Sequence, residues 1–164
     1  MTHEELEDVN LANTKKLAYF TSNDSPSPEA TGRDYLPKAS IIAANFLNSH
    51  KKQGFFLMIE GSQIDWGGHA NDTKYITSEV IYFDKAIGKM LDFAKKDKET
   101  LVIITADHET GGFAINPKSR MDSIQGAFTS SYHTGTMVPV FAYGPGSELF
   151  SGIYENTDIY HKMR

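Results

Sequence analysis

Three short apolar runs restrict what this chain can fold into. They are FFLMI at 55–59, LVIITA at 101–106 and MVPVFAY at 137–143. Each has the length of a strand buried on both faces, well short of the roughly 18 apolar residues that a membrane-spanning helix needs. Between the first two runs, apolar residues recur at steps of three and four from Ile76 to Ala94, which is typical of a helix. Strands that alternate with helices predict an α/β fold with a largely parallel sheet.

Further elements are expected on both sides of these runs. They are a strand at 15–20, an exposed loop at 21–34, a helix at 37–51 and a terminal helix that starts at Asn156 or Thr157. The central helix should begin at Asn71 or Asp72 and end near Lys96, and Pro139 favours an edge or strand-start position. A chain of 164 residues can bury roughly 70% of its unfolded surface. We therefore expect a single domain over 1–164, with a partial sheet flanked by helices.

The composition argues against several kinds of partner. The formal charge is −5 and no dense stripe of Lys and Arg is present, so a nucleic-acid partner is not expected. The chain has no cysteine, so a metal would have to be held by His, Asp and Glu. Residues 1–16 are acidic and lack the apolar core of a signal peptide. We expect neither a signal peptide nor a membrane segment in this chain.

Polar side chains follow two of the predicted strands at the point where each strand ends. Glu60 comes directly after the run 55–59, and Asp107 and His108 follow the run 101–106. Ligands of parallel α/β sheets gather at the carboxyl ends of the strands. We therefore expect these three side chains to arrive at one edge of the sheet.

Asp65 and His69 lie four residues apart, a spacing that places two ligands on one face of a helical turn. Gly67 and Gly68 between them make a regular helix unfavourable but allow tight backbone turns, so a loop could also bring the two side chains together. A carboxylate beside an imidazole suits Zn²⁺, Mn²⁺ or iron, whereas Glu60 suits Mg²⁺ or Ca²⁺. The alternative is an exposed Asp with a hydrogen-bonded His, because an isolated DxxxH pattern is common.

The ADHETGG segment at 106–112 is more specific. Adjacent ligands at a strand exit can diverge onto one ion, although an N-cap Asp with a surface His is the alternative. Glu109 is expected either to support the ligands or to lie in solvent. A third histidine, His133, stands in a loop of small residues just before the run 137–143. Carboxylates and imidazoles beside three predicted strands favour a binuclear hydrolytic centre.

These segments together resemble the alkaline phosphatase family. The resemblance lies in FFLMIEGSQIDWGGHAND, FDKAIGKMLDFA, TLVIITADHETGG, the HTG at 133–135, VPVFAYGPGSELF and YENTDI. It runs in order from about residue 35 to the end, whereas residues 1–34 resemble the family only loosely. It implies an alkaline-phosphatase-like α/β fold in which 1–164 forms the carboxyl-terminal part of the catalytic domain.

The resemblance also implies roles for individual residues. The expected ligands are Asp65, His69 and His133 for a first zinc, Asp107 and His108 for a second zinc, and Glu60 for a magnesium. In the family the first zinc binds the ester oxygen of the substrate and later activates water, and the second lowers the pKa of a serine nucleophile. Trp66 stands where members often carry Lys or His, so it forms either a rigid wall of the substrate pocket or a packed aromatic.

The family's serine nucleophile and phosphate-binding Arg precede the region that is resembled here. Ser22, Ser25 and Ser27 stand in a Pro-rich loop and are interpreted as solvated, and Arg33 is not supported as a phosphate clamp. The chain is therefore expected to supply most metal ligands but no nucleophile, and to be inactive alone.

For the parent protein, the resemblance implies hydrolysis of phosphate monoesters through a phosphoserine, with two Zn²⁺ and one Mg²⁺. It also implies a homodimer that is secreted or periplasmic. Two alternatives remain open at this point. One is a related two-metal phosphodiesterase or phosphomutase, and the other is a non-catalytic metal-binding fragment.

Overall fold

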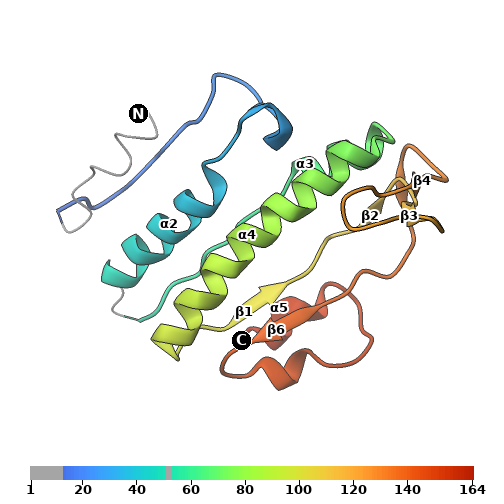
Figure 1. The fold of residues 1–164 in the computed structure, drawn as a ribbon. Helices are drawn as coiled ribbons and strands as arrows, with labels where there is room; N and C mark the ends of the chain where they lie inside the picture. Colours follow the sequence, from blue (N-terminus) through green and yellow to red (C-terminus); the bar gives the residue numbers. More distant parts are fainter. Residues whose placement is uncertain (1–12, 51–52) are drawn as a thin grey trace.

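The computed structural model describes residues 13–50 and 53–164, and a single long helix organises it. Helix α4 (Thr73–Asp97) crosses the middle of the molecule, with α2 (Leu36–His50) along one side and the pair of strands β1 (Val102–Ile104) and β6 (Phe141–Tyr143) along the other (Figure 1). The short helix α3 (Gln63–His69) packs on α4 near its start. The sequence predicts that the first helix ends at residue 51, which lies outside the described residues.

Helix α4 forms because its sequence has both a cap and a buried stripe. The carboxylate of Asp72 accepts hydrogen bonds from the backbone N–H groups of Lys74 at 2.9 Å and Tyr75 at 3.1 Å, which confirms the predicted N-cap. Residues at helical spacing are buried along one face, namely Ile76, Glu79, Tyr82, Ala86, Met90 and Ala94. The helix ends at Asp97, and its C-cap residue Lys98 is left-handed with a φ of 65°.

A strap of polar contacts ties the segment before α2 to α4. Arg33 forms a buried ion pair with Glu79, whose Oε1 also accepts the backbone N–H of Glu29 at 2.8 Å. The hydroxyl of Tyr82 accepts the backbone N–H of Leu36 at 2.7 Å, and burial raises the pKa of this phenol. The 3₁₀ helix η1 (Glu29–Thr31) belongs to this strap. Arg33 thus serves the fold, in agreement with the doubt about its role as a phosphate clamp.

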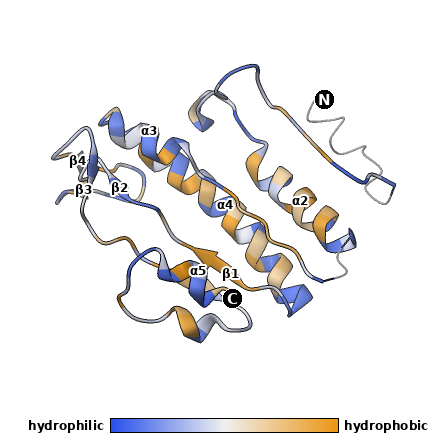
Figure 2. Ribbon diagram, turned by 180° about the vertical axis from the view of Figure 1, so that it is seen from behind, coloured by the Kyte–Doolittle hydropathy of each residue, from blue (hydrophilic) through white to orange (hydrophobic). Residues whose placement is uncertain are grey.

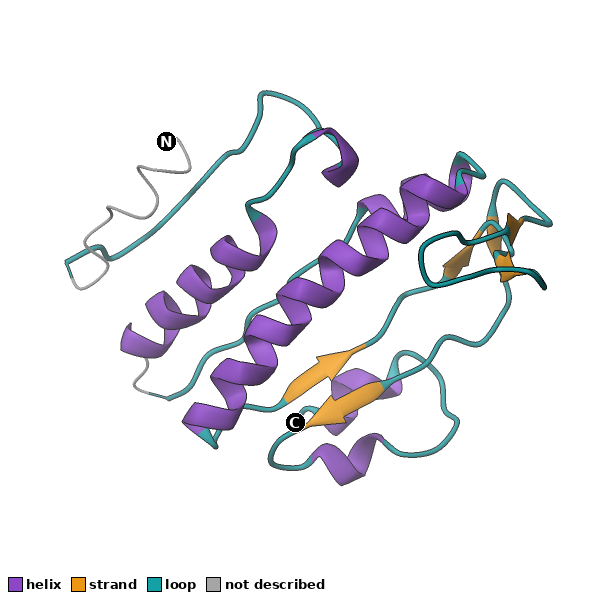
Figure 3. Cartoon of the chain, in the orientation of Figure 1, coloured by secondary structure: helices purple, strands orange, loops and turns teal. Residues whose placement is uncertain are grey.

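The strands pair differently from the prediction. In the described part of the chain they form three antiparallel pairs: β1 with β6, β2 (Glu109–Thr110) with β5 (His133–Thr134), and β3 (Ala114–Ile115) with β4 (Gly126–Ala127) (Figure 3). The expectation of a largely parallel sheet is therefore corrected. The chain returns from the β5 segment beside β1 in the opposite direction, so β6 becomes its antiparallel neighbour. The predicted strand 137–143 forms only over Phe141–Tyr143, and Pro139 lies two residues before it, outside the ladder.

The run 55–59 is extended but is not a strand. No backbone hydrogen bond joins it to any other described residue. It is hydrophobic, as is β1 (Figure 2), and both segments line one cavity of about 1680 Å³ together with the buried face of α4. A strand needs a hydrogen-bonded neighbour, and the cavity separates these two segments. The run therefore keeps its extended form without pairing.

Two shorter segments complete the comparison with the sequence. The predicted strand at 15–20 is wrong, because this segment has no strand structure and Phe20 is 80% exposed. The segment 21–34 is a loop apart from η1, as expected. The carboxyl end forms the 3₁₀ helix η2 (Ser147–Phe150) and then α5 (Asp158–Lys162), with Thr157 at its N-cap position. Among the described helices, none is both long enough and apolar enough to cross a membrane.

Candidate metal centre

Helix α3 is present although two glycines, which make a regular helix unfavourable, interrupt its sequence. A Cβ at Gly67 would lie 2.7 Å from the backbone nitrogen of Ile76 in α4, and one at Gly68 would lie 2.7 Å from the carbonyl oxygen of Thr110 in β2. Both glycines are buried. They allow α3 to fit between α4 and β2, and this packing offsets their poor helix propensity.

This close approach can be tested with a matched pair of glycines. Gly68→Ala should lower the free energy of unfolding by about 1–3 kcal/mol, because the new methyl group meets backbone that cannot move aside. Gly88→Ala in α4 should raise it by about 0.5–1 kcal/mol, because nothing lies within 4 Å of that position and alanine is the better helix former. Urea unfolding of both variants measures the difference. Equal effects of the two substitutions would show that Gly68 is not in close contact with Thr110 of β2.

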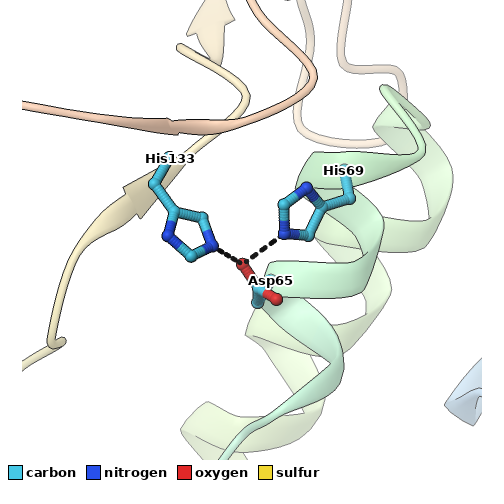
Figure 4. Close-up of side chains that lie close together, drawn as sticks. All are labelled: Asp65, His69 and His133. Atoms are coloured by element: carbon cyan, nitrogen blue, oxygen red, sulfur yellow. Dashed lines mark ion pairs between the residues drawn. The ribbon is translucent and has the colours of Figure 1, made fainter.

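Three of the predicted ligands lie together at the end of α3. Asp65 and His69 come from α3, one turn apart, and His133 comes from β5 (Figure 4). Oδ1 of Asp65 is 3.4 Å from Nε2 of His69 and 3.5 Å from Nε2 of His133. One potential ligand atom from each residue lies within 4.8 Å of the other two. The helical spacing of Asp65 and His69 was predicted as one of two routes to this arrangement.

The second predicted pair lies beside this cluster. The ring of His108 stacks on that of His133, with centroids 3.5 Å apart and planes at 18°. Nε2 of His108 is 3.1 Å from Oδ2 of Asp107, whose side chain is 85% exposed. The ring centroids of His69 and His133 are 5.1 Å apart. The three imidazoles thus form one group, to which α3, β5 and the segment between β1 and β2 contribute.

Hydrogen bonds at the far ring nitrogen orient two of the histidines. Nδ1 of His69 lies 2.7 Å from the carbonyl oxygen of Ser131, which can only accept a hydrogen bond, so Nδ1–H is the donor. Nδ1 of His108 lies 3.2 Å from the hydroxyl of Thr110. In both residues Nε2 is the atom that faces the neighbouring carboxylate. Such a partner at the far nitrogen is the usual support of a metal-binding imidazole.

Glu109 is not in solvent, which was one of the two expectations for it. Its carboxylate accepts the backbone N–H groups of Gly112 at 3.0 Å and Phe113 at 3.1 Å, and the hydroxyl of Thr134. Burial acts to raise the pKa of this carboxyl, but the hydrogen bonds from Thr134, Phe113 and Gly112 outweigh burial and hold the pKa below its ordinary value. Glu109 therefore ties the β2 turn to β5, the strand that carries His133.

Glu60 and Trp66 line the same cavity as Asp65 without joining the cluster. Glu60 is exposed at the end of the extended segment 54–60, and Trp66 is 40% exposed on α3. The indole of Trp66 is therefore partly exposed where it lines the cavity. Asp107, His108 and His133 line this cavity as well.

The serines of the loop 21–34 lie elsewhere. Ser22, Ser25 and Ser27 are exposed, and none of them lines the cavity, nor does Arg33. Sequence reasoning missed Thr110, whose hydroxyl donates to Oδ1 of Asp65 at 2.6 Å. The threonine of ADHET was passed over because it is neither a metal-seeking nor a nucleophilic residue by itself. Its signal was its place two residues after His108, just beyond the end of the predicted strand.

Comparison with known proteins identifies relatives along most of the chain. The family model described as alkaline phosphatase matches residues 36–127 and 122–164. Alkaline phosphatase 4 of Bacillus subtilis is 35% identical, in a match that covers 87% of this chain and 44% of the relative. Alkaline phosphatase of Escherichia coli is 29% identical, and the match covers 91% of this chain and 36% of the relative. The chain thus spans less than half the length of these relatives.

A solved structure agrees with the fold as well. The alkaline phosphatase from the Antarctic bacterium TAB5 superposes with a TM-score of 0.88 at 45% identity, over 97% of this chain and 48% of that one. A mutant of the same enzyme with Mg bound superposes with a TM-score of 0.85 at 44% identity, over 99% of this chain and 49% of that one. The expected alkaline-phosphatase-like α/β fold is therefore confirmed. The chain belongs to the alkaline phosphatase family.

Proposed function

We propose that this chain supplies most of the metal ligands of an enzyme that hydrolyses phosphate monoesters. The observation that carries the proposal is the cluster of Asp65, His69 and His133, with His108 stacked against it. Membership of the alkaline phosphatase family supports the reaction class. Because the relatives are more than twice as long, the activity is proposed for the whole protein of which this span forms a part.

The donor set fits the metals that the resemblance implies. Two imidazoles and one carboxylate converge within 4.8 Å, which suits a zinc site with an open position for water or substrate. Asp107 and His108 would hold a second zinc, since their facing atoms are 3.1 Å apart. Glu60 offers only oxygen, the donor that magnesium prefers. When bound, two zinc ions stabilise the attacking and leaving oxygens of an in-line displacement.

The residues of this chain have their own tasks at such a centre. Ser131 and Thr110 hold His69 and His108 with Nε2 facing the site. Glu109 fixes β5, and therefore His133, against the β2 turn. Trp66 forms an apolar wall with one N–H donor, so it would shape the pocket without adding charge. These contacts preorganise the ligands, which lowers the cost of binding a metal.

For the parent protein, the homodimer and its compartment rest on the resemblance, whereas the absence of a nucleic-acid partner rests on the charge of the chain. We propose a homodimer that is secreted or periplasmic, with no nucleic-acid or membrane partner. Two facts favour the alternative of a non-catalytic metal-binding fragment. The chain spans less than half the length of its relatives, and no nucleophile is assigned in it. It predicts metal binding without any turnover when the rest of the protein is present.

A zinc titration of the metal-free chain tests the proposed site. The ring signals of His69 and His133 should shift together in NMR spectra and saturate near one zinc, because both present Nε2 to Asp65. His50 and His161 are the internal controls and should not move, since they lie in α2 and α5. Equal shifts of all four histidines, or none, would contradict the site.

A further inference from the structure

One hydroxyl group lies between the proposed ligands of the two zinc ions. Oγ1 of Thr110 is 2.6 Å from Oδ1 of Asp65, which belongs to the first set, and 3.2 Å from Nδ1 of His108, which belongs to the second. Thr110 is 7% exposed, so water cannot easily replace either contact. The two proposed sites are thus joined by a single buried side chain.

Counting protons fixes the direction of both hydrogen bonds. A hydroxyl has one proton to donate, and an ionised carboxylate can only accept. The proton of Thr110 therefore goes to Asp65, and the hydroxyl oxygen accepts the Nδ1–H of His108. This keeps His108 in the tautomer whose Nε2 carries the lone pair, and that atom faces Asp107 at 3.1 Å.

Packing holds the threonine in place for this role. Its carbonyl oxygen and its Cβ would lie 2.7 Å and 2.9 Å from a Cβ at Gly68, so β2 and α3 touch directly at this point. The side chain is β-branched and therefore has a restricted χ1 angle. The backbone and Cβ of Thr110 are therefore held against α3, the helix that carries Asp65.

We propose that Thr110 is a positioning residue that orients Asp65 and His108 together and so couples the two metal sites. This inference rests on the proposed function, because it assumes that Asp65 and His108 bind metal. It assigns a role beyond the ligands themselves. Loss of the hydroxyl should weaken zinc binding and release the tautomer of His108, whereas a variant that keeps the hydroxyl should restore both.

Calorimetric titration of the metal-free full chain with zinc alone tests the coupling. Thr110→Val removes the hydroxyl at nearly constant shape and should weaken zinc binding by about tenfold or more, the usual effect of losing a residue that supports a ligand. Thr110→Ser should bind as the unchanged chain does. Thr77→Val is the matched control, because the hydroxyl of Thr77 donates only to the carbonyl of Thr73 within α4.

The second readout is the tautomer of His108 in the metal-free chain. Nitrogen-15 NMR of the imidazole should show Nδ1–H in the unchanged chain and in Thr110→Ser, but lose that preference in Thr110→Val. If Thr110→Val fails to fold by circular dichroism, Thr110→Ala provides the same comparison. Unchanged zinc affinity and an unchanged tautomer in the variant without the hydroxyl would overturn the inference.

Asp65→Asn separates this inference from the proposed function. If Asp65→Asn binds zinc as tightly as the unchanged chain, the metal site itself is wrong, and the role of Thr110 falls with it. If Asp65→Asn binds weakly while Thr110→Val binds normally, the metal site stands and only the coupling by Thr110 is overturned. Weak binding in both variants, restored in Thr110→Ser, supports both.

Discussion

The purified chain, supplied with zinc and magnesium, is expected to hydrolyse an aryl phosphate monoester no faster than the metals do in buffer. The serines of the loop 21–34 do not line the cavity, and Arg33 is engaged with Glu79. Loss of a serine nucleophile lowers kcat by about 10⁶-fold in another hydrolase, so a rate at least about 10⁴-fold below that of complete family members is expected. Release of the aryl alcohol, followed by its absorbance, measures the rate.

The control for this experiment is His133→Ala, which removes one ligand of the cluster. Its background rate should equal that of the unchanged chain, because we expect both proteins to lack the nucleophile. Robust, metal-dependent hydrolysis that His133→Ala abolishes would contradict the prediction and would place a nucleophile within this chain. Faster hydrolysis of a diester than of a monoester by the whole protein would instead favour the phosphodiesterase alternative.

The candidate site was easier to predict than the architecture around it. The residues Asp65, His69, His133 and His108 were singled out by their position after apolar runs and by resemblance, and the structure brings them together. The chain has only six histidines, so three of them near Asp65, in the order that the resemblance implies, are informative. Thr110 and Glu109 are different, because a supporting hydrogen bond depends on which segments meet and no local pattern reveals that.

The errors in the fold have a common physical origin. An apolar run such as 101–106 predicts burial, but it carries no information on the direction of its neighbour, so the antiparallel partner of β1 was missed. The glycines of α3 were interpreted from intrinsic propensity alone. Their small size is instead what permits the contact with Ile76 and Thr110. Pairing and close approach are tertiary properties, and they override local preferences.

Tertiary contacts also predict that replacing Glu79 lowers the stability of the fold strongly. No motif in the sequence marks this residue. Its carboxylate is buried in the face of α4, where it pairs with Arg33 and accepts the backbone N–H of Glu29 at 2.8 Å. Glu79→Ala would leave the guanidinium buried without its partner. The free energy of unfolding in urea should fall by about 3–5 kcal/mol, the cost of breaking a buried ion pair on one side.

The matched control for Glu79 is Asp92→Ala on the same helix. Asp92 pairs with Lys95 at 3.8 Å, but the two side chains are more than half exposed, so this pair should contribute less than about 1 kcal/mol. Similar losses in the two variants would show that the strap does not stabilise the fold. A large loss only in Glu79→Ala would mean that the strap holds α4, and with it the surface against which α3 presents Asp65 and His69.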